Sequence, residues 1–283
     1  MGNKKEKNLN NFDSNTVNSF GEEWTRYDQT NLKYADSLRY FNEYFSIFPW
    51  DKINSDSVGF DMGCGTGRWA IHMAPKVKRL NCIEPSKAIE IARKNLIDFE
   101  NVYFIKGDVN NSRLDNNSQD FGYSLGVLHH IPNTEKAIKS CVELLKPGAP
   151  LLLYIYYFFD DRPLWYKTLW FFSNILRNLI SKSPKKVKYL TSDLIALIIY
   201  FPLAKLSKIL ANKSISISKI PLSYYRNSSF YTMRTDALDR FGTPLEQRFT
   251  KKQIKEMCER SGLKDIIFSG DQPYWCCVGF KKN

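Results

Sequence analysis

The chain has 283 residues, of which 43% are hydrophobic and 25% charged, and its formal net charge is +12. This length and composition predict a buried core of ordinary size and exclude an intrinsically disordered protein. The six cysteines lack CxxC spacing and the three histidines form no ligand pattern, so we expect reduced thiols, a cytoplasmic location and no metal site.

The first fifty residues predict two kinds of structure. Residues 1–15 are mostly polar and charged, which indicates a disordered tail, and they include no apolar signal region. Residues 19–49 then place aromatic and apolar side chains at helical spacing. We therefore expect one or two helices before the first strand.

Strands and helices alternate from residue 57 onward. We expect strands at 57–62, 79–83, 102–106, 121–125 and 151–157, with helices between them at 68–74, 86–99 and 133–145. A capping box from Thr250 to Gln253 opens a last helix, and strands at 265–269 and 274–280 form a closing hairpin. The pattern predicts an α/β fold: a doubly wound Rossmann-like sheet, mostly parallel, with a C-terminal antiparallel hairpin, N-terminal helices and a helical cap insertion.

The domain organisation follows from the one interruption of this alternation. We expect a sheet domain at 16–159 and 250–283, and an insertion at 160–249 that covers the substrate. Residues 160–220 carry eleven Lys or Arg and three Asp, so much of the positive charge belongs to the insertion.

Two interpretations of the insertion remain open. Trp165, Leu169, Phe172, Leu176 and Leu179 lie on one helical face, and residues 194–204 are nearly all apolar. Eleven residues interrupted by a proline are fewer than the roughly 20 that cross a bilayer. The segment is therefore either a helical cap packed on the sheet domain, which we favour, or a basic interfacial element that lies on anionic lipid.

The stretch VGFDMGCGTGRWA at 58–70 indicates a ligand that approaches the main chain closely. Three glycines alternate with other residues after an aspartate at the end of an apolar strand. The P-loop pattern is absent, and Arg68 stands where the dinucleotide fingerprint needs a glycine.

This loop resembles the first motif of the class I S-adenosylmethionine (SAM)-dependent methyltransferases. The segments CIEPS, GDVNN, SLGVLHHIP and LLKPGAPLLL resemble further motifs of that family, in the same order and at similar spacing. The resemblance implies that the loop wraps the methionine and ribose of SAM, that Glu84 holds the ribose hydroxyls, and that Asp108 and Val109 hold adenine. It implies cofactor contacts from Asp61, Gly63, Cys64, Gly65, Gly67, Arg68, Glu84, Pro85, Asp108, Val109, Leu125 and Gly126.

Four further residues are candidates near the reacting atoms. His129 and His130 follow the fourth strand, at the sheet edge where ligands bind, and either could be a general base or a local structural residue. Trp24 and Tyr27 belong to a segment that folds over the cofactor in related methyltransferases. An aromatic face there could stabilise the sulfonium charge, which makes Trp24 a candidate cofactor contact and Tyr27 a candidate catalytic residue, or both could pack in the core.

The end of the insertion is dense in Tyr, Arg and Asp, which resembles the substrate cover of small-molecule methyltransferases. Arginines there could clamp a carboxylate or phosphate, or could hold the cap together by salt bridges. The candidate substrate-binding residues are Tyr224, Tyr225, Arg226, Arg234, Asp236 and Arg240.

We therefore expect methyl transfer from SAM, with S-adenosylhomocysteine as product, to a small-molecule acceptor such as a natural product, amine, sugar or anionic metabolite. The alternatives are a peripheral membrane methyltransferase acting on a lipid or quinone, and a non-catalytic protein with this fold. A nucleic-acid methyltransferase is disfavoured because SLGVLHH stands where such enzymes carry a Pro-Pro-aromatic motif. The acceptor atom and the oligomeric state stay open.

Overall fold

The computed structural model describes residues 11–159, 162–217 and 220–283. They divide into two compact units: Met1–Gln29, Ser37–Phe158 and Leu245–Asn283 form the first, and Thr30–Asp36 and Phe159–Pro244 form the second. Residues 245–249, which we expected within the insertion, therefore belong to the first unit. Residues 1–10 of the expected tail lie outside the described residues, and the chain is already helical at Ser14.

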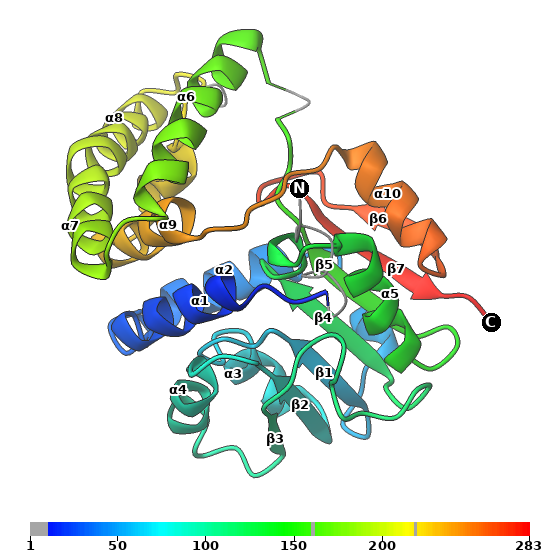
Figure 1. Cartoon of the computed structure of the whole chain (residues 1–283). Helices are drawn as coiled ribbons and strands as arrows, with labels where there is room; N and C mark the ends of the chain where they lie inside the picture. The colour runs from blue at the N-terminus through cyan, green and yellow to red at the C-terminus, as the bar shows by residue number, and fades with distance from the viewer. Residues whose placement is uncertain (1–10, 160–161, 218–219) are drawn as a thin grey trace, which may run out of the picture. The chain divides into compact units, whose positions relative to one another are not determined.

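The first unit is built on a seven-stranded sheet with the order β3-β2-β1-β4-β5-β7-β6 (Figure 1). Strands β1 to β5 pair in parallel, and β7 is antiparallel to both β5 and β6. This confirms the predicted doubly wound sheet with its antiparallel hairpin. The strands are β1 Val58–Met62, β2 Arg79–Ile83, β3 Val102–Ile105, β4 Phe121–Leu125, β5 Pro150–Tyr154, β6 Leu263–Phe268 and β7 Cys276–Lys281.

Six helices accompany this sheet, and local side chains define where several of them begin. The Asn133 side chain accepts a hydrogen bond from the Lys136 amide and caps α5, and Thr250 and Gln253 form the predicted capping box of α10. The helices are α1 Ser14–Arg26, α2 Tyr34–Tyr44, α3 Ala70–Met73, α4 Ala88–Asn95, α5 Thr134–Leu144 and α10 Lys251–Arg260.

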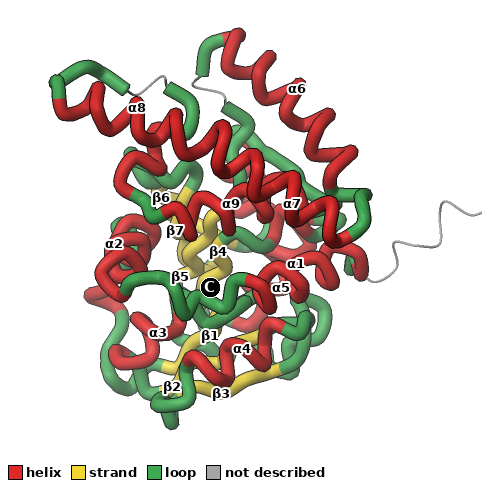
Figure 2. The backbone as a smooth tube through the Cα atoms, turned by 90° about the vertical axis from the view of Figure 1, so that its left-hand side faces the viewer, coloured by secondary structure: helices red, strands yellow, loops and turns green. Residues whose placement is uncertain are grey.

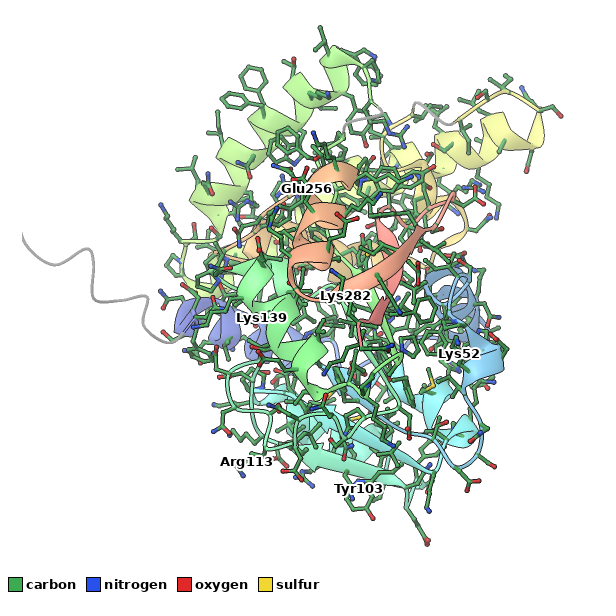
Figure 3. The ribbon with its side chains drawn as sticks, turned by 90° about the vertical axis from the view of Figure 1, so that its right-hand side faces the viewer. Lys52, Tyr103, Arg113, Lys139, Glu256 and Lys282 are labelled. Atoms are coloured by element: carbon green, nitrogen blue, oxygen red, sulfur yellow. The ribbon has the colours of Figure 1, made fainter. Side chains whose placement is uncertain are left out.

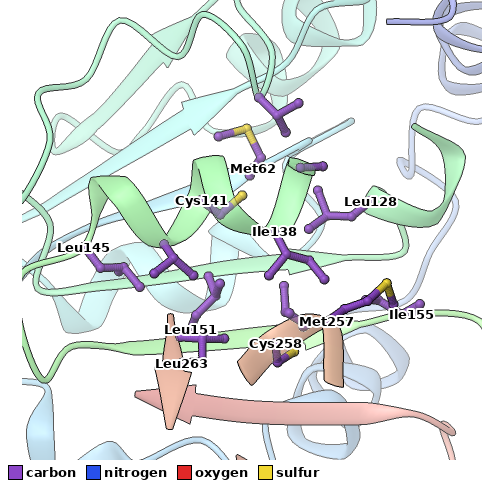
Figure 4. Close-up of a cluster of buried hydrophobic side chains, with 14 of the residues drawn as sticks. Met62, Leu128, Ile138, Cys141, Leu145, Leu151, Ile155, Met257, Cys258 and Leu263 are labelled. Atoms are coloured by element: carbon purple, nitrogen blue, oxygen red, sulfur yellow. The ribbon is translucent and has the colours of Figure 1, made fainter. Parts of the chain in front are cut away.

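Helices cover both faces of the sheet. Helices α5 and α10 bury one face, where Ile138 and Cys258 join alternate strand residues such as Leu151 in one apolar cluster (Figure 4). On the opposite face, aromatic residues that follow α2 pack on β4: Phe45 lies 5.2 Å from Tyr123 between ring centroids. Strands β1, β2, β4 and β5 are therefore buried on both sides, whereas the edge strands β3 and β6 keep exposed residues.

A pair of glycines sets the spacing between β1 and β4. A Cβ atom on Gly122 would lie 2.2 Å from the Phe60 ring, and one on Gly59 would lie 2.3 Å from the Phe121 ring. Because neighbouring strands are paired in register here, each phenylalanine occupies the space that its partner glycine leaves open. On each of these two strands, a phenylalanine ring thus packs over a glycine of the other strand.

The second unit is helical. Its core consists of buried residues from α6, from α9 and from residues 185–212 between them in the chain. They include Ile180, Tyr200, Met233 and Phe241. Arg234 of α9 also makes a two-point ion pair with Asp193 of α7, at 3.0 and 2.8 Å. Figure 2 shows these helices in red; they are α6 Leu164–Ile180, α7 Lys185–Ile195, α8 Phe201–Asn212 and α9 Phe230–Gly242.

Pro202 does not end the apolar segment, contrary to our expectation. Helices α7 and α8 are joined through a π-helical turn at Ala196–Tyr200, so one helix runs from Lys185 to Asn212. The wider turn accommodates a proline that cannot donate the usual backbone hydrogen bond. By length and composition this 28-residue helix could cross a membrane, which corrects the conclusion that the segment is too short.

The glycine–phenylalanine exchange predicts a large effect of one methyl group. We expect Gly122→Ala to lower the free energy of unfolding by about 1–3 kcal/mol, because the new Cβ atom overlaps the buried Phe60 ring. Urea denaturation measures the change. The control is Gly270→Ala, where the added atom meets no heavy atom within 4 Å. Equal stability of the two variants would contradict this account of the packing.

Candidate functional site

The glycine loop connects β1 to α3 and needs glycine for two different reasons. Gly63, Gly65 and Gly67 all have positive φ, at +78°, +54° and +80°, where side chains are strained. At Gly63 an added Cβ would also lie 2.6 Å from Val127, and at Gly67 it would lie 2.6 Å from Leu96. The loop is therefore held closely between its neighbours.

Backbone hydrogen bonds fix the start of this loop to the second strand. The amides of Gly63 and Cys64 both donate to the carbonyl of Ile83, at 2.8 and 3.1 Å. The Ile83 carbonyl lies at the carboxyl end of β2, beside the point where strand order reverses between β1 and β4. Ligands of open α/β sheets bind at such a reversal.

Trp24 of α1 lies against the middle of the loop. Its Nε1 atom is 3.4 Å from the position that a Cβ atom of Gly65 would occupy. The indole is half-buried, so part of it remains open to a ligand. The structure thus brings together Trp24 and the glycine loop, which are 41 positions apart in the sequence.

Asp61 is the most unusual group of the site. Its side chain is 1% exposed, and neither carboxylate oxygen has a hydrogen-bond partner among the described residues. Burial raises the pKa of Asp61 well above its ordinary value, and the negative charge of Glu84 adds to the rise. The Tyr123 hydroxyl opposes this rise but does not satisfy either oxygen. A cationic ligand group at Asp61 would remove the cost of burying this carboxylate.

Glu84 joins the loop to the turn after β2. One carboxylate oxygen accepts from the Gly65 amide at 3.1 Å, and the other accepts from the Ser86 amide at 2.9 Å. Burial raises the pKa of Glu84, while hydrogen bonds from the Ser86 hydroxyl and from the amides of Ser86 and Gly65 lower it by smaller amounts. A carboxylate has about four acceptor positions, so Glu84 can still accept a hydrogen bond from a ligand hydroxyl.

The other candidate cofactor residues lie around the same loop and strand ends. Asp108 accepts hydrogen bonds from the amides of Asn110 and Asn111, so it shapes the turn after β3, and Val109 is buried behind it. Hydrogen bonding with Cys82 and burial raise the pKa of Cys64, which keeps its thiol neutral. The remaining four are Pro85 and Arg68, both half-buried, Leu125, which is buried, and Gly126, which has a φ of +79°.

The two histidines after β4 lie in the 3-10 turn Leu128–His130, and both are buried. His129 stacks on Tyr156 with 3.9 Å between ring centroids, and burial lowers its pKa well below the ordinary value, so the ring is neutral at pH 7. His130 places Nδ1 2.6 Å from the Leu245 carbonyl. Because a carbonyl only accepts, Nδ1 carries the proton and Nε2 is the nitrogen that can accept one.

The other candidate for chemistry, Tyr27, is buried at the end of α1, where the Arg26 guanidinium lies 5.3 Å from its ring centroid.

The six candidate substrate residues belong to the second unit. Arg234 is engaged by Asp193, and Arg240 donates to Ser173 at 3.3 Å, so both contribute to helix packing. Tyr225 packs on Tyr200, Tyr224 on Tyr225, and Arg226 donates to the Ser223 carbonyl; Asp236 is half-buried on α9.

Two features of the site were missed by sequence reasoning. Tyr123 is the register partner of Asp61 on the neighbouring strand, and strand alternation would have found it only with the pairing known. Arg248 and Glu246 form a buried ion pair at 2.8 Å, and the Arg248 guanidinium lies over Tyr156 at 5.0 Å. We expected these two residues within the Tyr-, Arg- and Asp-rich end of the insertion, where salt bridges were one of the two interpretations, but they belong to the first unit, which no local pattern indicates.

Comparison with known proteins agrees with this geometry. Residues 60–153 match the family model of the methyltransferase domain, and no curated protein matches the chain by sequence. One similar structure is the protein assigned as the methyltransferase in a complex with the Trm112 methyltransferase activator of Haloferax volcanii. Its identity to this chain is 12%, the match covers 94% of this chain and 99% of that one, and the TM-score is 0.52.

A second similar structure is the CurJ carbon methyltransferase, with 11% identity, coverage of 93% of this chain and 59% of that one, and a TM-score of 0.50. At these identities the likenesses show the shared Rossmann-like fold. The first unit therefore has the fold of class I methyltransferases and contains a segment that matches their domain. Domain and fold together support a SAM-dependent methyltransferase.

The unpaired carboxylate predicts a pH-dependent gain in stability from Asp61→Asn. In the unfolded chain the aspartate titrates near pH 4, whereas burial raises its folded pKa, so the parent loses stability as pH rises through this interval. We expect the free energy of unfolding of the variant to exceed that of the parent by about 1–3 kcal/mol at pH 8. Below about pH 4 the two proteins should be equally stable. Urea denaturation across pH, with the exposed Asp115→Asn as control, measures this difference. A gain that is the same at all pH values would contradict it.

Proposed function

We propose that this chain is a SAM-dependent methyltransferase that acts on a small-molecule acceptor and releases S-adenosylhomocysteine. One observation carries the proposal: a buried carboxylate without a partner, Asp61, lies directly before a glycine loop at the point where strand order reverses. A cofactor that has an ammonium group, a vicinal diol and a flat base suits this arrangement of polar groups.

The residues of the loop and strand ends divide the binding of SAM among them. Asp61 would pair with the methionine ammonium, and Glu84 would accept hydrogen bonds from the ribose hydroxyls while its backbone contacts hold the loop in place. Asp108 and Val109 would hold the adenine, and Trp24 covers the loop at Gly65. When bound, the cofactor supplies an electrophilic methyl group on a sulfonium.

In this proposal, His129, His130 and Tyr27 help to bind and align the acceptor. In-line displacement requires the nucleophile to be positioned and water to be excluded, and a base is needed only where the acceptor must lose a proton. His130 suits that role because its tautomer leaves Nε2 as the accepting nitrogen. His129 is neutral and buried and packs against the Tyr156 ring, and Tyr27 would contribute from the end of α1.

Acceptor recognition belongs in this proposal to the aromatic and basic segment of the second unit. Tyr224, Tyr225 and Arg226 lie in one short turn, Ser223–Asn227. A phenol and a guanidinium there suit an acceptor that has an anionic or hydroxyl group, such as a sugar or an acidic metabolite. Arg234, Asp236 and Arg240 lie on α9, where Arg234 pairs with Asp193 of α7 and Arg240 donates to Ser173 of α6.

Calorimetric titration with S-adenosylhomocysteine tests the cofactor site directly. We expect micromolar binding, weakened at least about tenfold by Asp61→Ala or by Glu84→Ala, because each substitution leaves polar cofactor groups unpaired. The matched control is Asp115→Ala, an exposed acidic residue of the same unit, and its affinity should equal that of the parent.

Two outcomes would overturn the proposal. Folded protein that binds neither S-adenosylhomocysteine nor SAM would show that the site is vestigial and would favour a non-catalytic role. Binding that both substitutions leave unchanged would place the cofactor elsewhere. Denaturation curves on the same samples show whether each variant is folded.

A further inference from the structure

The second unit exposes an apolar face that its own core does not use. On α6, the residues Trp165, Leu169, Phe172, Leu176 and Leu179 recur every three or four positions, and each is between 42% and 66% exposed. We expected this face to pack as the inner side of a cap. Within the second unit this face lies away from the core, because α6 turns a different side, which includes Ile180, toward that core.

The long helix Lys185–Asn212 repeats this arrangement. Its buried side includes Ile195, Ala196 and Ala204, whereas a second stripe lies open to solvent. Only 28% of its apolar window is buried, although the core helix of a globular protein is mostly buried. The exposed stripe consists of Leu190, Leu194, Leu197, Ile198 and Phe201. Two adjacent helices with open apolar stripes exceed what soluble monomers ordinarily expose.

Positive charge accompanies these stripes. Residues 160–220 carry eleven Lys or Arg against three Asp. Several lysines on the long helix and its flanks are exposed and lie near the apolar positions in the sequence. They are Lys182, Lys185, Lys186, Lys205, Lys208 and Lys213. An apolar stripe bordered by lysines is complementary to a surface with acyl chains below and anionic headgroups above.

We propose that the second unit docks on the surface of a membrane that contains anionic lipid, with α6 and the Lys185–Asn212 helix lying in the interface. The apolar stripes enter the boundary between headgroups and acyl chains, and the lysines pair with lipid phosphates. The surface requires no cofactor, so this proposal does not rest on methyl transfer. If both hold, the acceptor is a small amphiphile that the enzyme takes from the membrane.

Docking on the surface suits the helix better than crossing the bilayer. The inner side of the Lys185–Asn212 helix bears Asp193, which is paired with Arg234 of α9, and Lys188, which is buried. A spanning helix would have to leave α9 and carry both charged residues into hydrocarbon. In the interface the helix keeps its ion pair and its core contacts, and only the stripe already open to solvent enters the lipid.

Charge also distinguishes the membrane from a second copy of the chain. A symmetric dimer through this face would place one set of lysines opposite the same set on its partner, which is unfavourable. Anionic lipid reverses the sign of the opposing surface. Self-association is therefore the competing outcome that the experiment must detect.

The test is co-sedimentation of the full chain with unilamellar vesicles of phosphatidylcholine, with and without phosphatidylglycerol. We expect binding to the anionic vesicles, at least about tenfold weaker binding to pure phosphatidylcholine, and partial release in high salt, which screens the lysines. Phe172→Ser combined with Ile198→Ser should weaken binding by at least about tenfold, because both side chains lose apolar area that enters the lipid.

Matched controls come from the first unit. Ile97→Ser removes an apolar side chain that is 77% exposed, and it should leave vesicle binding unchanged. Lys205→Glu with Lys208→Glu should weaken binding to anionic vesicles, whereas Lys139→Glu on α5 should not (Figure 3). Unchanged affinity for S-adenosylhomocysteine in each variant shows that the first unit is folded and separates this test from that of the proposed function.

Two results would overturn the proposal. Folded protein that ignores anionic vesicles at low salt would exclude a membrane-docking surface. A dimer in sedimentation velocity that the Phe172→Ser and Ile198→Ser pair disperses, without vesicle binding by the parent, would assign the face to self-association instead.

Discussion

The site depends on one unfavourable interaction, the burial of the Asp61 carboxylate without a partner. The sheet places this residue on β1, one position before the strand ends, and no described side chain makes a hydrogen bond to it at normal geometry that would offset the cost. Everything nearby is consistent with a binding site that the ligand itself completes: glycines that expose the backbone, a second carboxylate at Glu84, and an indole over the loop. Such a site sacrifices stability in the free protein to gain affinity for a cation.

The rigidity that this site needs comes from packing on the strands around it. The exchange of Phe60 and Phe121 with Gly122 and Gly59 brings β1 and β4 together, and the amides of the loop bond to the end of β2. The loop is therefore held by the three strands that border the ligand crevice. Preorganised polar groups of this kind bind a ligand without losing conformational freedom at the moment of association.

Much of the chemistry could be predicted locally, and the reason is geometric. Gly63, Gly65 and Gly67 need positive φ, and Glu84 ends a strand, so both features leave marks within a few residues of sequence. Tyr123, Arg248 and Glu246 could not be predicted, because each reaches the site through strand pairing or through a segment that returns after the insertion. The solvent exposure of the α6 stripe was also beyond the sequence, since an apolar helical face looks the same whether it is buried or open.

The sequence by itself determined the order of strands and helices, the glycine loop, the capping box at Thr250 and the basic character of the insertion. These depend on periodicity, backbone conformation and composition, all of which are local. The tertiary structure decided which carboxylate is buried without a partner, which tautomer His130 adopts, and that the helix continues through Pro202 with an apolar stripe facing outward. Those properties depend on what lies across space from each side chain, and only the folded chain brings such neighbours together.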